Sequence, residues 1–133
     1  DLHLSLRRQR QMCIRDRADY NQDGRVDLAI GQNNAPTRLV LNVGGKPGLR
    51  VRLKGIGRNP AAIGAKLSIR FPGGPELTRE IQSGSGYWGV NSPVIVLPGL
   101  AAQAEITVAW PSGGRTSHNI AAGTRQAVLS QEQ

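Results

Sequence analysis

The chain has 133 residues, enough for one domain of ordinary size or for one domain and part of another. Apolar residues make up 38% and aromatic residues only 4%, so a core would consist of Val, Ile, Leu and Ala, and the 17 Gly and 8 Pro supply many turns. This composition favours short strands, and no apolar run approaches the roughly 18 residues of a membrane-spanning helix.

The formal charge of +8 raises the question of a nucleic-acid partner. The basic residues are spread at strand-like intervals, as in LRVRLK at 49–54, and do not gather into a run. Aromatic side chains that could stack on bases are scarce. The pattern therefore favours the solvated outer faces of strands over a nucleic-acid groove.

Residues 1–17 share neither the glycine content nor the alternation of the rest of the chain. They lack the apolar segment and the small-residue cleavage site of a signal peptide. The tract LRRQRQMCIRDR resembles translated sequencing-adapter read-through. We therefore predict a non-native head at 1–17, which includes His3 and Cys13, and expect the natural protein to continue upstream of Ala18.

The segment DYNQDGRVD at 19–27 places three carboxylates within nine residues. Like charges this close repel, and a bound cation would offset the repulsion. Ca²⁺ takes about six to eight oxygen ligands, which the pattern D-x-N-x-D-G-x-x-D can supply from a bend made possible by Gly24. We predict a Ca²⁺ site formed by the side chains of Asp19, Asn21, Asp23 and Asp27 and by the main-chain carbonyl of Arg25.

This loop differs from an EF-hand, in which a bidentate Glu completes the ligand set. Ile30 stands where that Glu would be, and VDLAIG at 26–31 alternates with the period of a strand. The alternative is an Asx-rich turn without a ligand, because Asp, Asn and Gly all favour turns. A calcium loop that leads into a β-strand is our leading interpretation.

The stretch DYNQDGRVDLAIGQNNAPTRLVLNVGG resembles the second half of an FG-GAP/VCBS repeat, in which such a loop joins two strands of a β-propeller blade. The resemblance implies a partial repeat over residues 18–45. One half-repeat cannot bury its own apolar face. We therefore expect the partners of this segment to include propeller blades upstream in the same chain.

From residue 46 onward, apolar and polar residues alternate in short runs separated by turns. We predict strands at LRVRLK, KLSIRF, ELTREIQ, SPVIVL, AEITVAW and RQAVLS. Strands of this length and spacing indicate an antiparallel sandwich or barrel. The predicted fold class is all-β: a hairpin of a propeller-type blade followed by an antiparallel β-sandwich or barrel-like domain.

The runs VRLKGIGRNPAAIGAKLSI, SGSGYWGVNSP and ITVAWPSGG resemble the ASPIC/UnbV domain of the cartilage acidic protein-like family, and we assign residues 46–133 to it. Two departures are LPGL at 97–100, where the family has an aromatic-Gly-Leu-Gly turn, and Trp88-Gly89 after the tyrosine. The resemblance implies an extracellular, calcium-dependent protein of adhesion or matrix type, and it implies no catalytic residue.

Nucleophilic catalysis requires a base beside the nucleophile. Adjacent Ser117 and His118 would point to opposite faces of a strand, and we interpret His118 as a surface or turn residue. We therefore expect a non-enzymatic module that binds a protein or a glycan surface. The open alternatives are a carbohydrate-binding module that uses Tyr87 and Trp88, a basic nucleic-acid binder, and an enzymatic role with catalytic groups supplied upstream.

Overall fold

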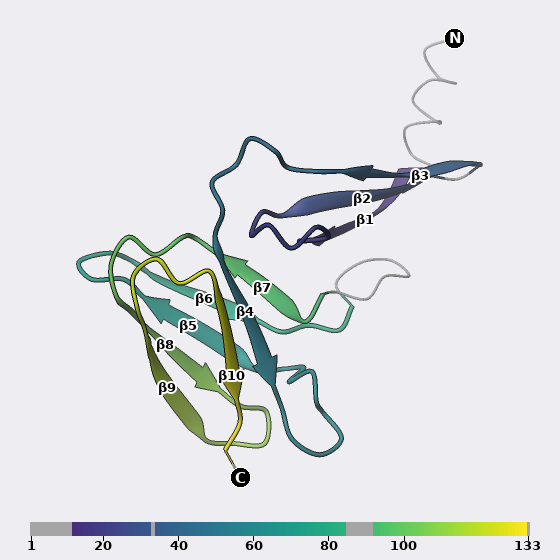
Figure 1. Ribbon diagram of the computed structural model, residues 1–133. Coiled ribbons are helices and arrows are strands. Elements are labelled where there is room, and N and C mark those ends of the chain that lie inside the picture. Colours follow the sequence, from purple (N-terminus) through teal and green to yellow (C-terminus); the bar gives the residue numbers. More distant parts are fainter. Residues whose placement is uncertain (1–11, 33, 85–91, 133) are drawn as a thin grey trace.

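The computed structural model describes residues 12–32, 34–84 and 92–132, which form strands and turns without any helix. Three sheets result, with the strand orders β1-β2-β3, β10-β4-β7 and β6-β5-β8-β9 (Figure 1). The strands are β1 (Met12–Ala18), β2 (Asp27–Gln32), β3 (Ala35–Val40), β4 (Leu49–Lys54), β5 (Lys66–Arg70), β6 (Glu76–Glu80), β7 (Val94–Leu97), β8 (Ala104–Ala109), β9 (Arg115–Ile120) and β10 (Gln126–Ser130). The predicted all-β, sandwich-like fold is confirmed, and within the described ranges no sheet closes into a barrel.

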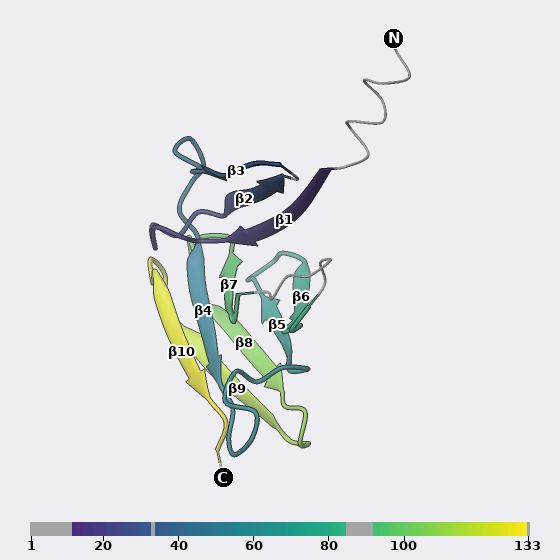
Figure 2. The ribbon, with the colours of Figure 1, turned by 90° about the vertical axis from the view of Figure 1, so that its right-hand side faces the viewer.

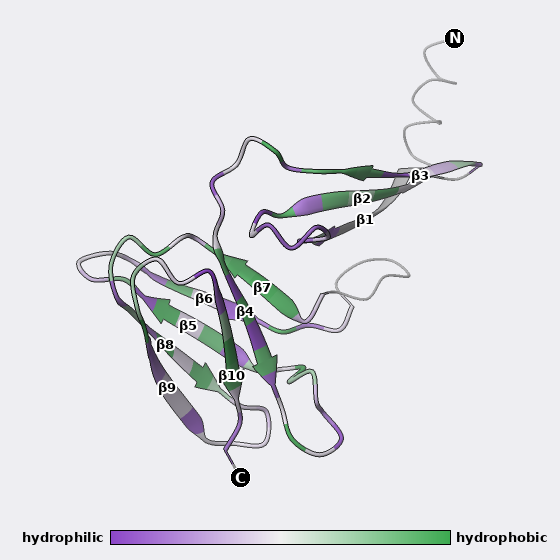
Figure 3. Ribbon diagram, in the orientation of Figure 1, coloured by the Kyte–Doolittle hydropathy of each residue, from purple (hydrophilic) through white to green (hydrophobic). Residues whose placement is uncertain are grey.

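The second and third sheets face each other and enclose one apolar core (Figure 2). Along β4, the side chains of Leu49, Val51 and Leu53 are at most 1% exposed, whereas Arg52 and Lys54 lie in solvent. The same alternation is visible in the hydropathy of the strands (Figure 3). Strands β5 and β8 of the facing sheet contribute their own inward-pointing residues, which are Leu67, Ile69, Ile106 and Val108. The period of two in the sequence thus sets which face of each strand is buried.

Strand β10 departs from the predicted antiparallel arrangement. It pairs with β4 in parallel, from Gln126 opposite Arg50 to Ser130 opposite Lys54, whereas β7 pairs with β4 in the antiparallel sense. A parallel pair requires a crossover connection. The chain supplies it by leaving β4 for the facing sheet and returning from β9 to the free edge of β4.

Strand β9 was not among the predicted strands, because RTSHNI is polar along most of its length. It pairs with β8, and its alternate residues Thr116 and His118 are half-buried on the inner side. The Thr116 hydroxyl accepts the indole N–H of Trp110 at 3.0 Å and lies 3.2 Å from His118 Nε2. Ser117 points the other way, toward the hydroxyl of Thr107 at 3.1 Å. His118, predicted as a surface or turn residue, is therefore a half-buried residue of an edge strand in a polar network.

The sheet β1-β2-β3 is an antiparallel meander without a buried core of its own. Most of β1 comes from residues 12–17 of the predicted head, which pair with β2. Every buried apolar side chain whose burial the structure describes lies at Leu49 or beyond. In the N-terminal sheet Leu28 and Ile30 are half-buried, whereas apolar side chains of β3 and the segment after it lie in solvent, with Leu39 55% and Val43 83% exposed. The N-terminal sheet therefore relies on contacts outside itself.

One such contact joins the loop after β1 to the start of β4. The N–H of Gly48 donates to the carbonyl of Gly24 at 2.7 Å. A Cβ at Gly48 would stand only 2.1 Å from the carbonyl oxygen of Leu97. A Cβ at Gly24 would stand 3.0 Å from the carbonyl oxygen of Gly48. These two glycines let the three chain segments approach one another closely.

We expect Gly48→Ala to lower the free energy of unfolding by about 1–3 kcal/mol, because the new methyl group would force the backbones of β4 and β7 apart. Gly44→Ala is the matched control, since no atom lies within 4 Å of a Cβ at that position. Urea unfolding followed by tryptophan fluorescence measures both variants. Equal stability of the two would contradict the close approach.

Candidate metal site

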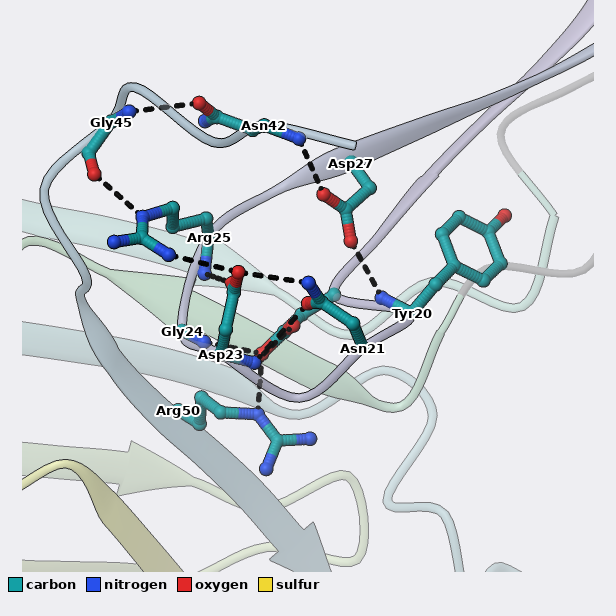
Figure 4. Close-up of polar contacts among 10 residues, drawn as sticks. Tyr20, Asn21, Asp23, Gly24, Arg25, Asp27, Asn42, Gly45 and Arg50 are labelled. Atoms are coloured by element: carbon teal, nitrogen blue, oxygen red, sulfur yellow. Dashed lines mark hydrogen bonds and ion pairs between the residues drawn. The ribbon is translucent and has the colours of Figure 1, made fainter. Parts of the chain in front are cut away.

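The acidic loop, residues 19–27, bends back on the carboxylate of Asp19. Gln22 and Gly24 both adopt positive φ, at 62° and 82°. The main-chain N–H groups of Asp23 and Gly24 then donate to Asp19 Oδ1 and Oδ2, each at 2.9 Å (Figure 4). One side chain therefore fixes the bend by accepting hydrogen bonds from two main-chain donors.

Two further predicted ligands lie in the same bend. The side-chain oxygen of Asn21 accepts the N–H of Asp23 at 3.3 Å, and its Nδ2 donates to Asp23 Oδ2 at 2.9 Å. Asp23 Oδ1 accepts the N–H of Arg25 at 2.8 Å. The oxygens of Asp19, Asn21 and Asp23 are thus gathered around the main-chain N–H groups of residues 23–25.

Two arginines supply positive charge to these carboxylates. Arg25 Nη1 lies 2.9 Å from Asp23 Oδ2, and Arg25 Nε donates to the carbonyl of Gly45 at 2.6 Å. Arg50 Nε, from β4, lies 2.6 Å from Asp19 Oδ2. This contact is an ion pair without hydrogen-bond alignment, since Arg50 Nε is buried and has no hydrogen-bond partner among the described residues. The repulsion among the carboxylates is therefore already reduced from within the chain.

The pKa of Asp23 reflects these contacts. Partial burial raises it, but hydrogen bonds from Asn21, from the main chain of Arg25 and from the Arg25 guanidinium, together with that positive charge, leave the pKa below its ordinary value. Because the folded-state pKa is lower than that of the unfolded chain, the contribution of Asp23 to stability is complete above the unfolded-state pKa and is lost as pH falls through the folded-state pKa. Asp23 is therefore a carboxylate at neutral pH.

Asp27 has a different role. Its side chain is 1% exposed, and its two oxygens accept the N–H of Tyr20 at 3.0 Å and that of Asn42 at 2.8 Å. Asn42 in turn accepts the N–H of Gly45 at 2.9 Å. Asp27 thus ties the loop after β1 to the segment after β3, and Figure 4 shows its carboxylate facing Tyr20 and Asn42.

The predicted ligand set is therefore assembled in part. Its oxygens suit a hard cation in type, and Asp19, Asn21 and Asp23 lie together within the bend, whereas Asp27 binds the main chain of Tyr20 and Asn42. In the part of the chain that the structure describes, no three His, Cys, Asp or Glu side chains form a metal-binding group. A cation would thus be held first by Asp19, Asn21 and Asp23.

Sequence reasoning missed Arg50, which contacts the loop from outside it. LRVRLK gives no signal that one of its three outward cations is held at a carboxylate, because that contact depends on how the loop packs against β4. The predicted carbohydrate contact residues Tyr87 and Trp88 lie outside the described residues.

The family model for ASPIC and UnbV matches residues 55–133, which is more than half of the chain, so the chain belongs to this family. The predicted ASPIC/UnbV resemblance is confirmed, while those to an FG-GAP/VCBS repeat and to adapter read-through stay predictions. Comparisons with curated proteins and with solved structures found no match. Family membership is consistent with an extracellular β module, and none of the described residues form a helix able to cross a membrane.

We expect Asp27→Asn to lower the free energy of unfolding by about 1–3 kcal/mol in the presence of EDTA. The Asn side chain has a single acceptor oxygen, whereas the N–H groups of Tyr20 and Asn42 each bind a separate oxygen of Asp27. Glu76→Gln is the control, since its carboxylate is exposed and lies 3.7 Å from Arg70, an ion pair worth less than about 1 kcal/mol. Chemical denaturation measures both. Wild-type stability of Asp27→Asn would show that the two hydrogen bonds contribute nothing.

Proposed function

We propose that this member of the ASPIC and UnbV family is a non-enzymatic, extracellular, calcium-binding β module that binds a protein or a surface of the adhesion or matrix type. The observation that carries the calcium part is the grouping of Asp19, Asn21 and Asp23 in one bend that contacts β4. Family membership supports the extracellular part.

In this proposal Ca²⁺ is held by Asp19, Asn21 and Asp23, with the carbonyl of Arg25 and the carboxylate of Asp27 as further donors offered by the sequence pattern. The ion would offset the remaining repulsion between the carboxylates. Because the loop also contacts Gly48 and Arg50, a bound ion would hold the N-terminal sheet more firmly against the sandwich.

A binding role is also supported by the arrangement of polar side chains. Ser117 and His118 face opposite sides of β9, so these two residues do not pair as nucleophile and base. On the outer face of the four-stranded sheet, Arg70 stands between Glu76 and Glu105 in neighbouring strands. Such interspersed charges do not form the continuous basic surface that a nucleic-acid partner requires.

We expect Ca²⁺ to raise the melting temperature, and EDTA to reverse the effect. A concentration about 100-fold above the dissociation constant would stabilise the folded state by about 2.7 kcal/mol, which is on the order of 10 °C for a chain of this size. Differential scanning calorimetry of the full chain measures the shift. Asp23→Asn should lose most of it while Glu76→Gln, the matched carboxylate-to-amide change, keeps it. An unchanged melting temperature in millimolar Ca²⁺ would end the calcium proposal.

We expect Arg25→Gln to strengthen Ca²⁺ binding by about two- to fivefold, because the guanidinium that lies 2.9 Å from Asp23 competes with an external cation. Isothermal titration calorimetry measures the affinity. Arg79→Gln, which removes an exposed arginine from β6, controls for the change in net charge. Weaker binding in Arg25→Gln than in this control would show that Arg25 supports the site instead of competing for it.

A further inference from the structure

Two hollows adjoin where the acidic loop meets the sandwich. The first has a volume of about 230 Å³ and lies between loop residues 22–24 and the side chains of Arg50, Arg125 and Gln126. The second has a volume of about 250 Å³ and is lined by Pro47, Gly99, Ala101 and their neighbours. Because Gly48 and Arg125 line both hollows, we treat them as one groove, called the joint groove below.

Arg125 carries the unmatched positive charge of the joint groove. The nearby carboxylates already have cations beside them, since Asp23 pairs with Arg25 at 2.9 Å and Asp19 with Arg50 at 2.6 Å. Arg125 is exposed, and among the described residues no carboxylate pairs with it. Its main chain is fixed, because its carbonyl accepts the N–H of Arg50 at 2.9 Å. The groove thus presents a guanidinium on a fixed main chain, with no carboxylate partner in the described ranges.

Arg50 adds a second guanidinium to the same hollow. Its Nη1 reaches Gln126 Oε1 only at 3.5 Å, the outer limit of a hydrogen bond. Pairing of β4 with β10 places Arg50 directly opposite Gln126, the residue after Arg125. Guanidinium groups present planar forks of N–H donors that match the two oxygens of a carboxylate. The first hollow therefore suits a carboxylate group.

The second hollow differs in having no charged side chain except Arg125. Its walls are main chain and the small or apolar side chains of Pro47, Leu100 and Ala101. A polysaccharide with an anionic group on each repeat would place charge in both hollows. One charged hollow next to an uncharged one instead matches adjacent residues of an extended peptide.

We propose that the joint groove binds an extended peptide, with an Asp or Glu carboxylate at Arg125 and Arg50 and a small uncharged side chain in the second hollow. The inference rests on the proposed role as a protein-binding module, and it does not depend on Ca²⁺. It gives the partner a definite chemistry: an acidic segment with small neighbouring side chains.

The test uses the full chain in EDTA, so that failure of the calcium proposal cannot affect it. The probe is a fluorescein-labelled, C-terminally amidated octapeptide of alternating Glu and Ala, and fluorescence anisotropy measures its affinity. We expect this peptide to bind and its Gln–Ala counterpart not to bind. Arg125→Gln should weaken binding by about tenfold, which corresponds to the loss of a charge-assisted contact.

The matched variant is Arg115→Gln, which removes an exposed arginine at the start of β9 in the other sheet. It should change the affinity by less than about twofold, because screening at physiological salt limits distant charges. Unaltered melting temperatures of both variants would confirm that each is folded.

Four results would overturn the inference. The first is that the wild-type chain binds neither peptide, and the second is that it binds both equally. The third is that Arg125→Gln and Arg115→Gln weaken binding to the same extent, which would indicate a general charge effect. The fourth is that a heparin-derived oligosaccharide binds more tightly than the Glu–Ala peptide and depends on Arg125, which would assign the groove to an anionic glycan.

Discussion

The carboxylate of Asp19 connects the two parts of this protein. Its oxygens accept the N–H groups of Asp23 and Gly24, and Arg50 of β4 lies 2.6 Å from one of them. The side chain is 1% exposed, and burial of a charge is costly unless hydrogen bonds and an opposite charge compensate for it. The bend of the loop and its contact with the sandwich therefore depend on each other.

The two sheets joined by this contact differ in how they are stabilised. The sandwich buries apolar side chains from both of its sheets, whereas the apolar side chains described in the N-terminal sheet are half-buried or exposed. Polar contacts through Asp27, Asn42 and the main chain of Gly24 take the place of a core there. Such contacts are directional, so they fix the position of the loop more than they add to stability.

The same residues also explain why charged side chains gather where the loop meets the sandwich. Closely spaced carboxylates attract cations, whether an arginine of the chain or an external Ca²⁺, and the calcium proposal follows from this competition. Arg25 and Arg50 match two of the carboxylates, while Arg125 has no carboxylate partner within the part of the chain that the structure describes. The joint is thus acidic within the loop and basic along the adjoining groove.

The sequence by itself determined the local features: the alternation that buries one face of β4, β5 and β8, the tight acidic bend, and the family. These depend on neighbouring residues, whose spacing fixes the direction of side chains in a strand and the turn tendency of Asp, Asn and Gly. Only the tertiary structure decided that β10 pairs with β4 in parallel and that polar β9 completes a sheet. It also decided that Asp27 accepts hydrogen bonds from main-chain N–H groups and that Arg50 contacts Asp19. Each of these joins residues distant in the chain, and such pairings follow from the packing of whole sheets, which no local pattern encodes.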